Sequence, residues 1–298
     1  MAAVGLGAYA IVVQRSEIQH ALGRVGIVVP LLAFFAVLAG LAASALSWWA
    51  LLVELGEDLP WRSGMRVFFL GQLGKYLPGG VWPVLAQMEL GHAAGARPRR
   101  VGAAAVVVMG INVTTGLLVA VGCLPFSSSR ALHRSAWVLA LLPVGLALLY
   151  PRLLGAVVDR LLRLVGRDGL DRPLRWHGVL VATFWSLVMW MFYGVQIAVL
   201  ARPLESTGHR LPLLAIGAYA LAWVVGFVVV VAPAGVGARE GMLVLALTPA
   251  LSASAATAVA LVSRLVMTVA DFTWAAIAGA TGRRVVRPDM PESTPSRS

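Results

Sequence analysis

Long apolar runs separated by short polar segments make up most of the chain, and they predict a bundle of membrane-spanning helices. A helix needs about 20 apolar residues to cross the hydrocarbon core of a bilayer. Runs that approach or exceed this length lie at about 27–53, 101–122, 135–150, 178–200 and 211–231, and a last run contains Arg264. An earlier run, 2–13, is short for a span, and a trimmed first helix or an imprecise chain start fits it better than a cleaved signal peptide. The expected fold class is therefore an all-α, polytopic integral membrane bundle with about seven to nine membrane segments.

Proline, glycine and charge interrupt two of the apolar segments, one in each half of the chain. The first, near 67–90, contains Gly74, Lys75, Tyr76, Pro78, Gly79 and Gly80, and the second, near 233–251, contains Pro233, Gly235, Gly237, Arg239 and Glu240. Irregular backbone at membrane depth is tolerated only where protein or a water-filled cavity satisfies it. Both segments are therefore expected to be re-entrant or broken helices. Paired interruptions of this kind point to a transporter binding site between two repeats, and an inverted repeat is a hypothesis for the bundle.

Composition supports a membrane protein and narrows the chemistry. The chain is 59% hydrophobic and 12% charged, with mean hydropathy +0.85, which is outside the range of a soluble domain. The formal net charge is +11, but the arginines lie mainly in short loops, which is typical of topology signals and contact with anionic headgroups rather than of nucleic-acid binding. A single cysteine excludes an internal disulfide, and the histidines show no metal-ligand spacing. We expect no metal, no cofactor and no nucleic-acid partner.

Arginine distribution between alternate loops predicts the orientation. Loops 54–66, 91–101 and 151–176 together with the tail 282–298 hold 15 arginines, and the opposite loops hold 6. Because cytoplasmic loops are enriched in basic residues, we expect both termini in the cytoplasm and the protein in the cytoplasmic (inner) membrane. Residues 1–281 form a single transmembrane domain, in which 151–176 is an amphipathic surface helix or a solvated basic loop, and 282–298 is a disordered tail.

Several uncharged residues within the spans have structural interpretations. Trp48 and Trp49 suit an interfacial aromatic belt, and the polar residues Asn112, Thr114, Thr115 and Gln196 are explained by hydrogen bonds between helices.

The two interrupted segments also carry a family resemblance. Residues 74–80, Gly-Lys-Tyr-Leu-Pro-Gly-Gly, and residues 233–241, Pro-Ala-Gly-Val-Gly-Ala-Arg-Glu-Gly, follow a tryptophan-rich span and precede a last span with Arg264. In this order and spacing the chain resembles the transmembrane region of lysylphosphatidylglycerol synthase and its stand-alone flippase-like relatives. The resemblance implies an integral membrane protein that moves, or helps to move, an anionic or zwitterionic lipid. The synthase's separate soluble domain is not in this sequence, so no aminoacyl transfer is expected. Family members place an arginine shortly after the first motif, where this chain has Gln87 and Glu89.

Charged residues of the two segments and of the last span are the candidate binding residues. Lys75, Arg239 and Arg264, with Tyr76 and Glu240 beside them, are expected to bind the phosphate of a membrane lipid, because a buried charge in a membrane should face protein, water or a headgroup. Lysine snorkelling and a fixed Arg239–Glu240 ion pair are the structural alternatives. Asp271 shares a helix face with Arg264, and it either neutralises a nearby charge or couples transport to a proton. The prolines and glycines named above are expected to shape the backbone.

The leading functional hypothesis is a flippase-like transporter of a phospholipid or a polyprenyl-phosphate-linked glycolipid, and not an enzyme. One rival is a membrane-embedded glycosyltransferase or other lipid-modifying enzyme, for which Glu54, Glu57 and Asp58 are the best catalytic candidates. The other rival is a scaffold in a complex with a glycosyltransferase or synthase partner. It predicts that the charged residues of the motifs can be neutralised without loss of function.

Overall fold

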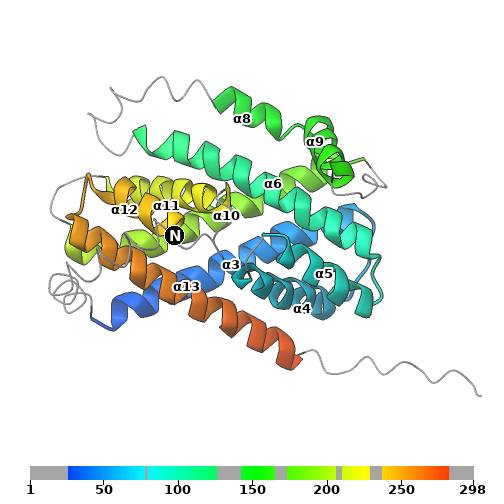
Figure 1. The fold of residues 1–298 in the computed structure, drawn as a ribbon, viewed down its shortest axis with the longest axis horizontal. Helices are drawn as coiled ribbons and strands as arrows, with labels where there is room; N and C mark the ends of the chain where they lie inside the picture. The colour runs from blue at the N-terminus through cyan, green and yellow to red at the C-terminus, as the bar shows by residue number, and fades with distance from the viewer. Residues whose placement is uncertain are drawn as a thin grey trace, which may run out of the picture.

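The computed structural model describes residues 26–77, 80–125, 142–164, 173–205, 210–228 and 237–281, and most of these residues lie in helices (Figure 1). Five of the described helices are long and apolar enough to cross a membrane. They are α3 (Val28–Glu54), α6 (Pro98–Cys123), α10 (Trp176–Ala201, extended by the short 3-10 helix η4, Arg202–Leu204), α11 (Leu211–Val228) and α13 (Ala253–Thr281). The expected all-α membrane bundle is confirmed. The predicted segments 2–13 and 282–298, and residues 135–141 of the predicted run 135–150, lie outside the described residues.

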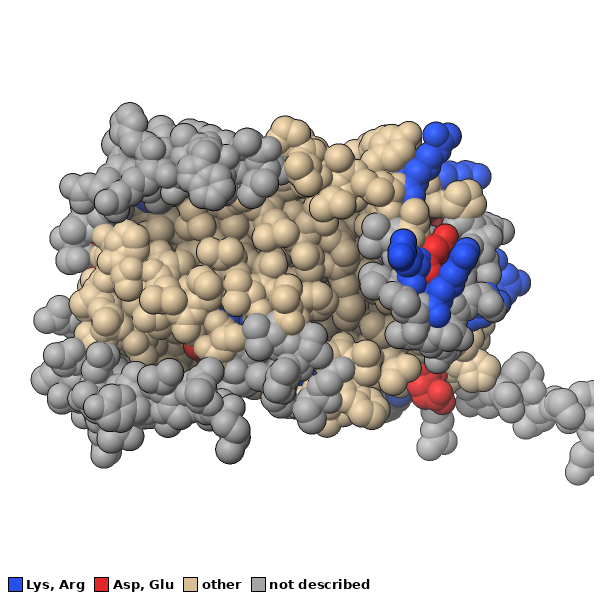
Figure 2. Space-filling view, turned by 45° about the horizontal axis from the view of Figure 1, so that its top comes forward, with Lys and Arg blue, Asp and Glu red and all other residues tan. Residues whose placement is uncertain are grey.

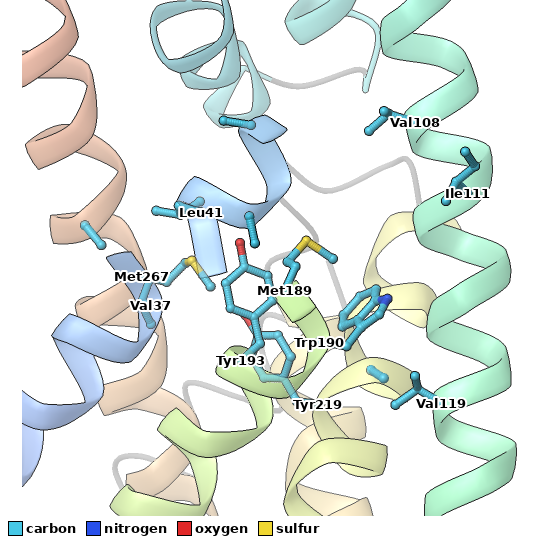
Figure 3. Packing of buried hydrophobic residues seen from close by; sticks show 14 of the residues in the cluster. Val37, Leu41, Val108, Ile111, Val119, Met189, Trp190, Tyr193, Tyr219 and Met267 are labelled. Atoms are coloured by element: carbon cyan, nitrogen blue, oxygen red, sulfur yellow. The ribbon is translucent and has the colours of Figure 1, made fainter. Parts of the chain in front are cut away.

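Helices α3 and α10 form the most extensive helix–helix contact in the described part of the bundle. Small residues allow close packing between them: a Cβ on Gly40 of α3 would lie 2.5 Å from the Tyr193 ring of α10. Ser47 of α3 donates a hydrogen bond to the Ala182 carbonyl across the same contact. Figure 3 shows Met189, Trp190 and Tyr193 in the packed core around these helices. In a membrane, close packing of this kind replaces the hydrophobic effect as the force that holds helices together.

Polar residues within the spans form hydrogen bonds between helices, as predicted. Ser186 of α10 bonds both Asn112 and Thr115 of α6, and Trp190 donates to Thr115. Gln196 of α10 donates to Ser263 of α13, whereas Thr114 bonds a carbonyl of its own helix.

The interfacial position expected for Trp48 is wrong. Trp48 is fully buried, and its ring packs against Phe68 with 5.7 Å between centroids. The apolar residues around it do not distinguish a belt tryptophan from a core one in the sequence. Trp49 is partly buried and packs edge-on against Trp61.

The first interrupted segment is a helical hairpin. Helix α4 (Trp61–Gln72) continues into a 3-10 turn, η1 (Leu73–Tyr76), and α5 (Trp82–Ala93) begins after the break. Gly71 lies against Gln87 and Gly74 against Trp82 and Pro83, so α4 and α5 run antiparallel. Each has 12 residues, or about 18 Å of helix, which is too short to cross a bilayer core of about 30 Å. The predicted break therefore lies between two short antiparallel helices.

The second interrupted segment contains the short helix α12 (Ala238–Leu247), and α11 precedes it along the chain. Helix α11 runs antiparallel to α6, because Gly217 lies against Leu124 while Val224 lies against Gly116. The register places Val228, where α11 ends, close to the middle of α6. Helix α12 has 10 residues, about 15 Å, and its first turn is level with Arg264 in the middle of α13. Figure 1 shows α12 turning back toward the end of the bundle where α13 begins.

Two shorter helices, α8 (Leu142–Leu148) and α9 (Pro151–Leu164), cover the side of α6. Helix α9 confirms that the basic region after Tyr150 contains a helix. The loop between α5 and α6 and the loop after α3 meet at the same end of the bundle, where Arg97 and Arg100 contact Glu57. Figure 2 shows basic side chains gathered at this end.

Candidate functional site

A cavity of about 370 Å³ lies where the two interrupted segments approach each other inside the bundle. Helices α3, α4, α5, α6, α10, α11, α12 and α13 all contribute to its wall. Its polar and charged lining residues are Ser44, Gln72, Lys75, Tyr76, Gln87, Asn112, Tyr193, Arg239, Arg264, Thr268 and Asp271. The rest of the wall is apolar and includes Trp48, Phe68, Met189, Trp223 and Phe227. The cavity thus combines a charged region with an aromatic and aliphatic one.

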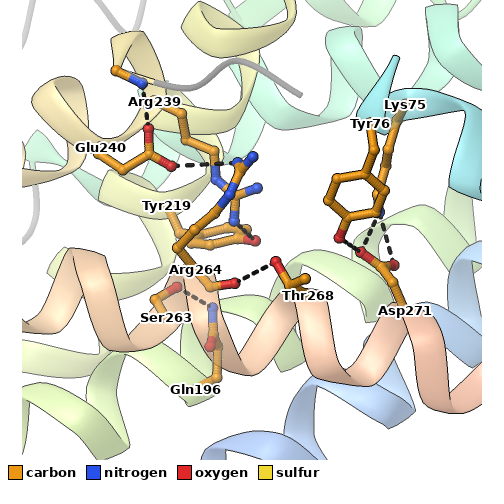
Figure 4. Close-up of polar contacts among 11 residues, drawn as sticks. Lys75, Tyr76, Gln196, Tyr219, Arg239, Glu240, Ser263, Arg264, Thr268 and Asp271 are labelled. Carbon is orange, nitrogen blue, oxygen red and sulfur yellow. Dashed lines mark hydrogen bonds and ion pairs between the residues drawn. The ribbon is translucent and has the colours of Figure 1, made fainter. Parts of the chain in front are cut away.

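Helix α13 anchors the first hairpin through Asp271. The Lys75 ammonium lies 2.7 Å from each oxygen of the Asp271 carboxylate, and the Tyr76 hydroxyl donates to one of them at 2.7 Å (Figure 4). Asp271 is 3% exposed, and the Lys75 side chain is 28% exposed. The carboxylate is therefore neutralised and doubly hydrogen-bonded, which is the condition for keeping a charge buried.

The second segment is anchored to α13 by Glu240. Its Oε1 lies 3.3 Å from the Arg264 guanidinium, and its Oε2 accepts the Gly237 backbone N–H at 2.7 Å. Gly237 has φ +87°, a backbone conformation that favours glycine, and it immediately precedes α12. Glu240 therefore both caps the helix and pairs with a cation. The predicted helix start after Gly237 is confirmed, but the fixed Arg239–Glu240 ion pair is not found.

Arg239 differs from the other two cations of the cavity. Its guanidinium donates a hydrogen bond to the Tyr219 hydroxyl and lies 4.8 Å from the centre of the Tyr219 ring. Among the described residues, no carboxylate forms an ion pair with it. The charged residues of this region are Lys75, Arg239 and Arg264 against Asp271 and Glu240, which leaves one positive charge. That charge lies on Arg239.

Most predicted binding residues come together in this cavity. The cavity is lined by Lys75, Tyr76, Arg239, Arg264 and Asp271. Glu240 is outside the lining and accepts a hydrogen bond from Arg264. Arg264 and Asp271 share a face of α13 as predicted, yet each pairs with a different interrupted segment rather than with the other.

The shaping residues of the motifs have separate places. Gly80 lines the cavity and has φ +52°. Gly74 lies outside the lining and allows α4 to approach the backbone at Trp82. Pro78, Gly79, Pro233 and Gly235 lie outside the described residues.

Sequence reasoning missed several uncharged lining residues. Ser44, Gln72 and Gln87 add polar atoms to the wall. Tyr219, which is outside the lining, accepts a hydrogen bond from Arg239 and was also missed. Each is a single polar residue in an apolar helix, so only the fold shows which of them face the same space. The sequence did give one signal at Gln87. Members of the family that the chain resembles have an arginine near this position, where this chain has a glutamine. Glu89, the other residue noted there, is exposed.

The acidic candidates for an enzyme site lie outside the cavity lining, where Asp58 is exposed and the other two contact arginines. Glu57 accepts hydrogen bonds from the Arg97 backbone N–H and from the Arg100 side chain, both at 3.2 Å. Glu54 lies 4.0 Å from Arg175. Within the described part of the chain, no three histidine, cysteine or acidic residues form a group that could hold a metal ion.

Comparison with known proteins gives one family. A sequence model of the family described as "Lysylphosphatidylglycerol synthase TM region" matches residues 1–275. This is the family that the two interrupted motifs resemble. A search of curated proteins found no match.

Proposed function

Because the chain belongs to the lysylphosphatidylglycerol synthase transmembrane-region family, we propose that this multi-pass membrane protein translocates an anionic or zwitterionic phospholipid, or a polyprenyl-phosphate-linked glycolipid. The headgroup phosphate binds in the cavity, and the acyl or prenyl chains stay in the bilayer. The observation that carries the proposal is the position of Arg239, a guanidinium in a membrane cavity with no paired carboxylate among the described residues.

A buried cation without an anionic partner is costly in a membrane. A phosphate would supply the missing charge and could accept two parallel N–H bonds from guanidinium. Lys75 and Arg264 also line the cavity, and both side chains are partly exposed. A phosphate bound at Arg239 would therefore lie near three cations and two carboxylates, and it would neutralise the one excess positive charge.

The volume of the cavity agrees with a headgroup rather than a whole lipid. At about 370 Å³ it is at the lower end of the range of small-molecule sites. The two interrupted segments enter from opposite ends of the bundle and end at the cavity. Movement of either segment against α13 would open the cavity toward one leaflet, as alternating access requires.

The alternatives have less support. An enzyme would need a free acid or base at the site, whereas the one lining carboxylate among the described residues, Asp271, is engaged by Lys75 and Tyr76. A scaffold would not need charges at membrane depth, and these charges are costly to place there.

Reconstitution in liposomes tests the proposal. Leaflet exchange of fluorescent phospholipid and polyprenyl-phosphate sugar probes is compared among the wild type, Arg239→Ala and the control Arg202→Ala, which removes an exposed arginine outside the cavity. We expect Arg239→Ala to slow exchange at least about tenfold, as the loss of a charge-assisted pair predicts, and Arg202→Ala to match the wild type. Equal exchange in all three would refute the phosphate site, and chemical conversion of a probe would favour an enzyme.

A further inference from the structure

Two polar groups in the cavity wall lack a hydrogen-bond partner among the described residues. They are the Trp48 indole N–H and the Gln87 side-chain carbonyl, and both atoms are enclosed. Trp48 is fully buried, and Gln87 is 2% exposed. Nearly all buried polar groups in native proteins are hydrogen-bonded, so each exception needs an explanation. Because both residues line the cavity, a bound ligand can supply that explanation.

The first hairpin places these two groups beside one turn of α4. Trp48 packs on Phe68, and the Gln87 side chain lies against Gly71, three residues further along the same helix. Residues three apart lie on one helix face. A Cβ on Gly71 would lie 2.4 Å from Gln87 Cγ, so glycine at this position allows the glutamine to approach α4. Trp48 and Gln87 therefore pack against the same face of α4, and both line the cavity.

Two further polar residues surround this side. Ser44 is one turn before Trp48 on α3, and Asn112 lines the cavity from α6. The Asn112 carbonyl already accepts a hydrogen bond from Ser186, so its amide NH2 remains as a donor toward a ligand. These groups are neutral, and the one carboxylate among the described lining residues, Asp271, is paired with Lys75.

We propose that Trp48 and Gln87 form a second subsite that binds an uncharged hydroxyl group of the lipid headgroup, next to the phosphate bound by Arg239. A hydroxyl donates and accepts at once, so it can satisfy both the indole N–H and the glutamine carbonyl. An ammonium has no lone pair with which to accept from the indole N–H, so it would leave that donor unsatisfied. The subsite therefore selects phospholipids with glycerol or sugar headgroups over those with amine headgroups. This inference rests on the proposed function for its phosphate and names the headgroup class that accompanies it.

Lipid retention by the purified protein tests the selection without requiring transport. Native mass spectrometry would measure which lipid the purified protein retains from an equal mixture of phosphatidylglycerol and phosphatidylethanolamine with the same acyl chains. In a second mixture, a polyprenyl-phosphate hexose lipid replaces phosphatidylglycerol. The wild type should retain the hydroxyl-bearing lipid at least tenfold over the amine lipid in one of the mixtures. Gln87→Leu should reduce that preference about tenfold. The control Gln196→Leu removes a buried amide outside the cavity lining and should leave the preference unchanged.

A second variant keeps the test decisive if Gln87→Leu folds poorly. Gln87→Glu places a carboxylate of nearly the same shape at the subsite and should shift retention toward the amine lipid. A soluble deacylated phosphoglycerol ester added at equal concentration should not displace the lipid, and displacement would overturn the assignment to a membrane lipid. Equal retention of all lipids by the wild type, or no change in Gln87→Leu and Gln87→Glu, would overturn the subsite.

The two proposals fail separately. Selective retention without leaflet exchange would refute transport and leave the subsite standing. Leaflet exchange without headgroup selection would refute the subsite alone.

Discussion

Asp271 organises the charge of the cavity, because its carboxylate is fixed by two residues of the first hairpin. Lys75 supplies the counter-charge and Tyr76 a hydrogen bond. This pairing changes the interpretation of Lys75. The sequence made it a candidate phosphate ligand beside Arg239 and Arg264, whereas in the structure it neutralises Asp271, and Arg239 holds the unbalanced charge.

Removing Lys75 should destabilise the protein more than removing its whole ion pair. In Lys75→Ala the buried Asp271 carboxylate loses its counter-ion, at a cost of about 3 kcal/mol in the free energy of unfolding, the lower end for a stranded buried charge because Lys75 is partly exposed. In the double variant Lys75→Ala/Asp271→Asn the carboxylate is gone, so most of the stability should return. Unfolding of the purified proteins in detergent measures this. A double variant no more stable than Lys75→Ala would show that the ion pair is not the source of the loss.

At this scale the sequence predicts which residues carry charge in the membrane but not how they pair. Arg264 and Asp271 are seven residues apart, and this spacing correctly gives a shared face of α13. Their partners come from segments 24 and 196 residues away along the chain. Pairing over such separations depends on the packing of whole helices, which local spacing does not contain.

The two interrupted segments are the elements that place these residues. Each ends near the middle of the bundle, and α13 binds one through Asp271 and the other through Arg264. These two residues lie on either side of Met267, the central residue of α13. Proline and glycine in the sequence predicted both breaks, because these residues interrupt helices for local reasons. The antiparallel packing of α4 on α5 follows from contacts between side chains and is not encoded locally.

Close backbone contact at Gly74 should make the first hairpin sensitive to one added methyl group. A Cβ there would lie 2.7 Å from the Trp82 carbonyl carbon and 2.8 Å from the Pro83 nitrogen, and backbone cannot move aside as a flexible side chain can. Gly74→Ala should therefore lower the free energy of unfolding by about 1 to 3 kcal/mol, as overpacking does. It should also slow lipid exchange, because Lys75 and Tyr76 follow directly.

Gly241→Ala is the matched control for this change. Gly241 lies in α12 with no atom within 4 Å of an added Cβ, so alanine should be neutral or stabilise by up to about 1 kcal/mol through helix propensity. Thermal unfolding and leaflet exchange of both variants give the comparison. Equal effects of the two substitutions would mean that the contact at Trp82 does not hold the hairpin.

At the scale of the whole molecule, the bundle has one end rich in arginine. The loop after α3, the loop between α5 and α6, and the beginning of α10 meet there, through contacts of Glu57 with Arg97 and Arg100 and of Glu54 with Arg175. The last helix, α13, ends on the same side in Figure 1. These are the segments that the arginine count assigned to one face of the membrane, so sequence and fold agree on which loops lie together.

Orientation follows from this asymmetry and can be measured by labelling. Because basic loops stay in the cytoplasm, the arginine-rich end should be cytoplasmic. In a Cys123→Ser background, Asp58→Cys places a thiol at this end, and Ala253→Cys places one at the opposite end, both at exposed positions. A membrane-impermeant maleimide should label Ala253→Cys in intact cells and Asp58→Cys only after permeabilisation. The reverse pattern would invert the protein and assign the hairpin formed by α4 and α5 to the outer leaflet, so the result also fixes which interrupted segment opens the cavity to the cytoplasm.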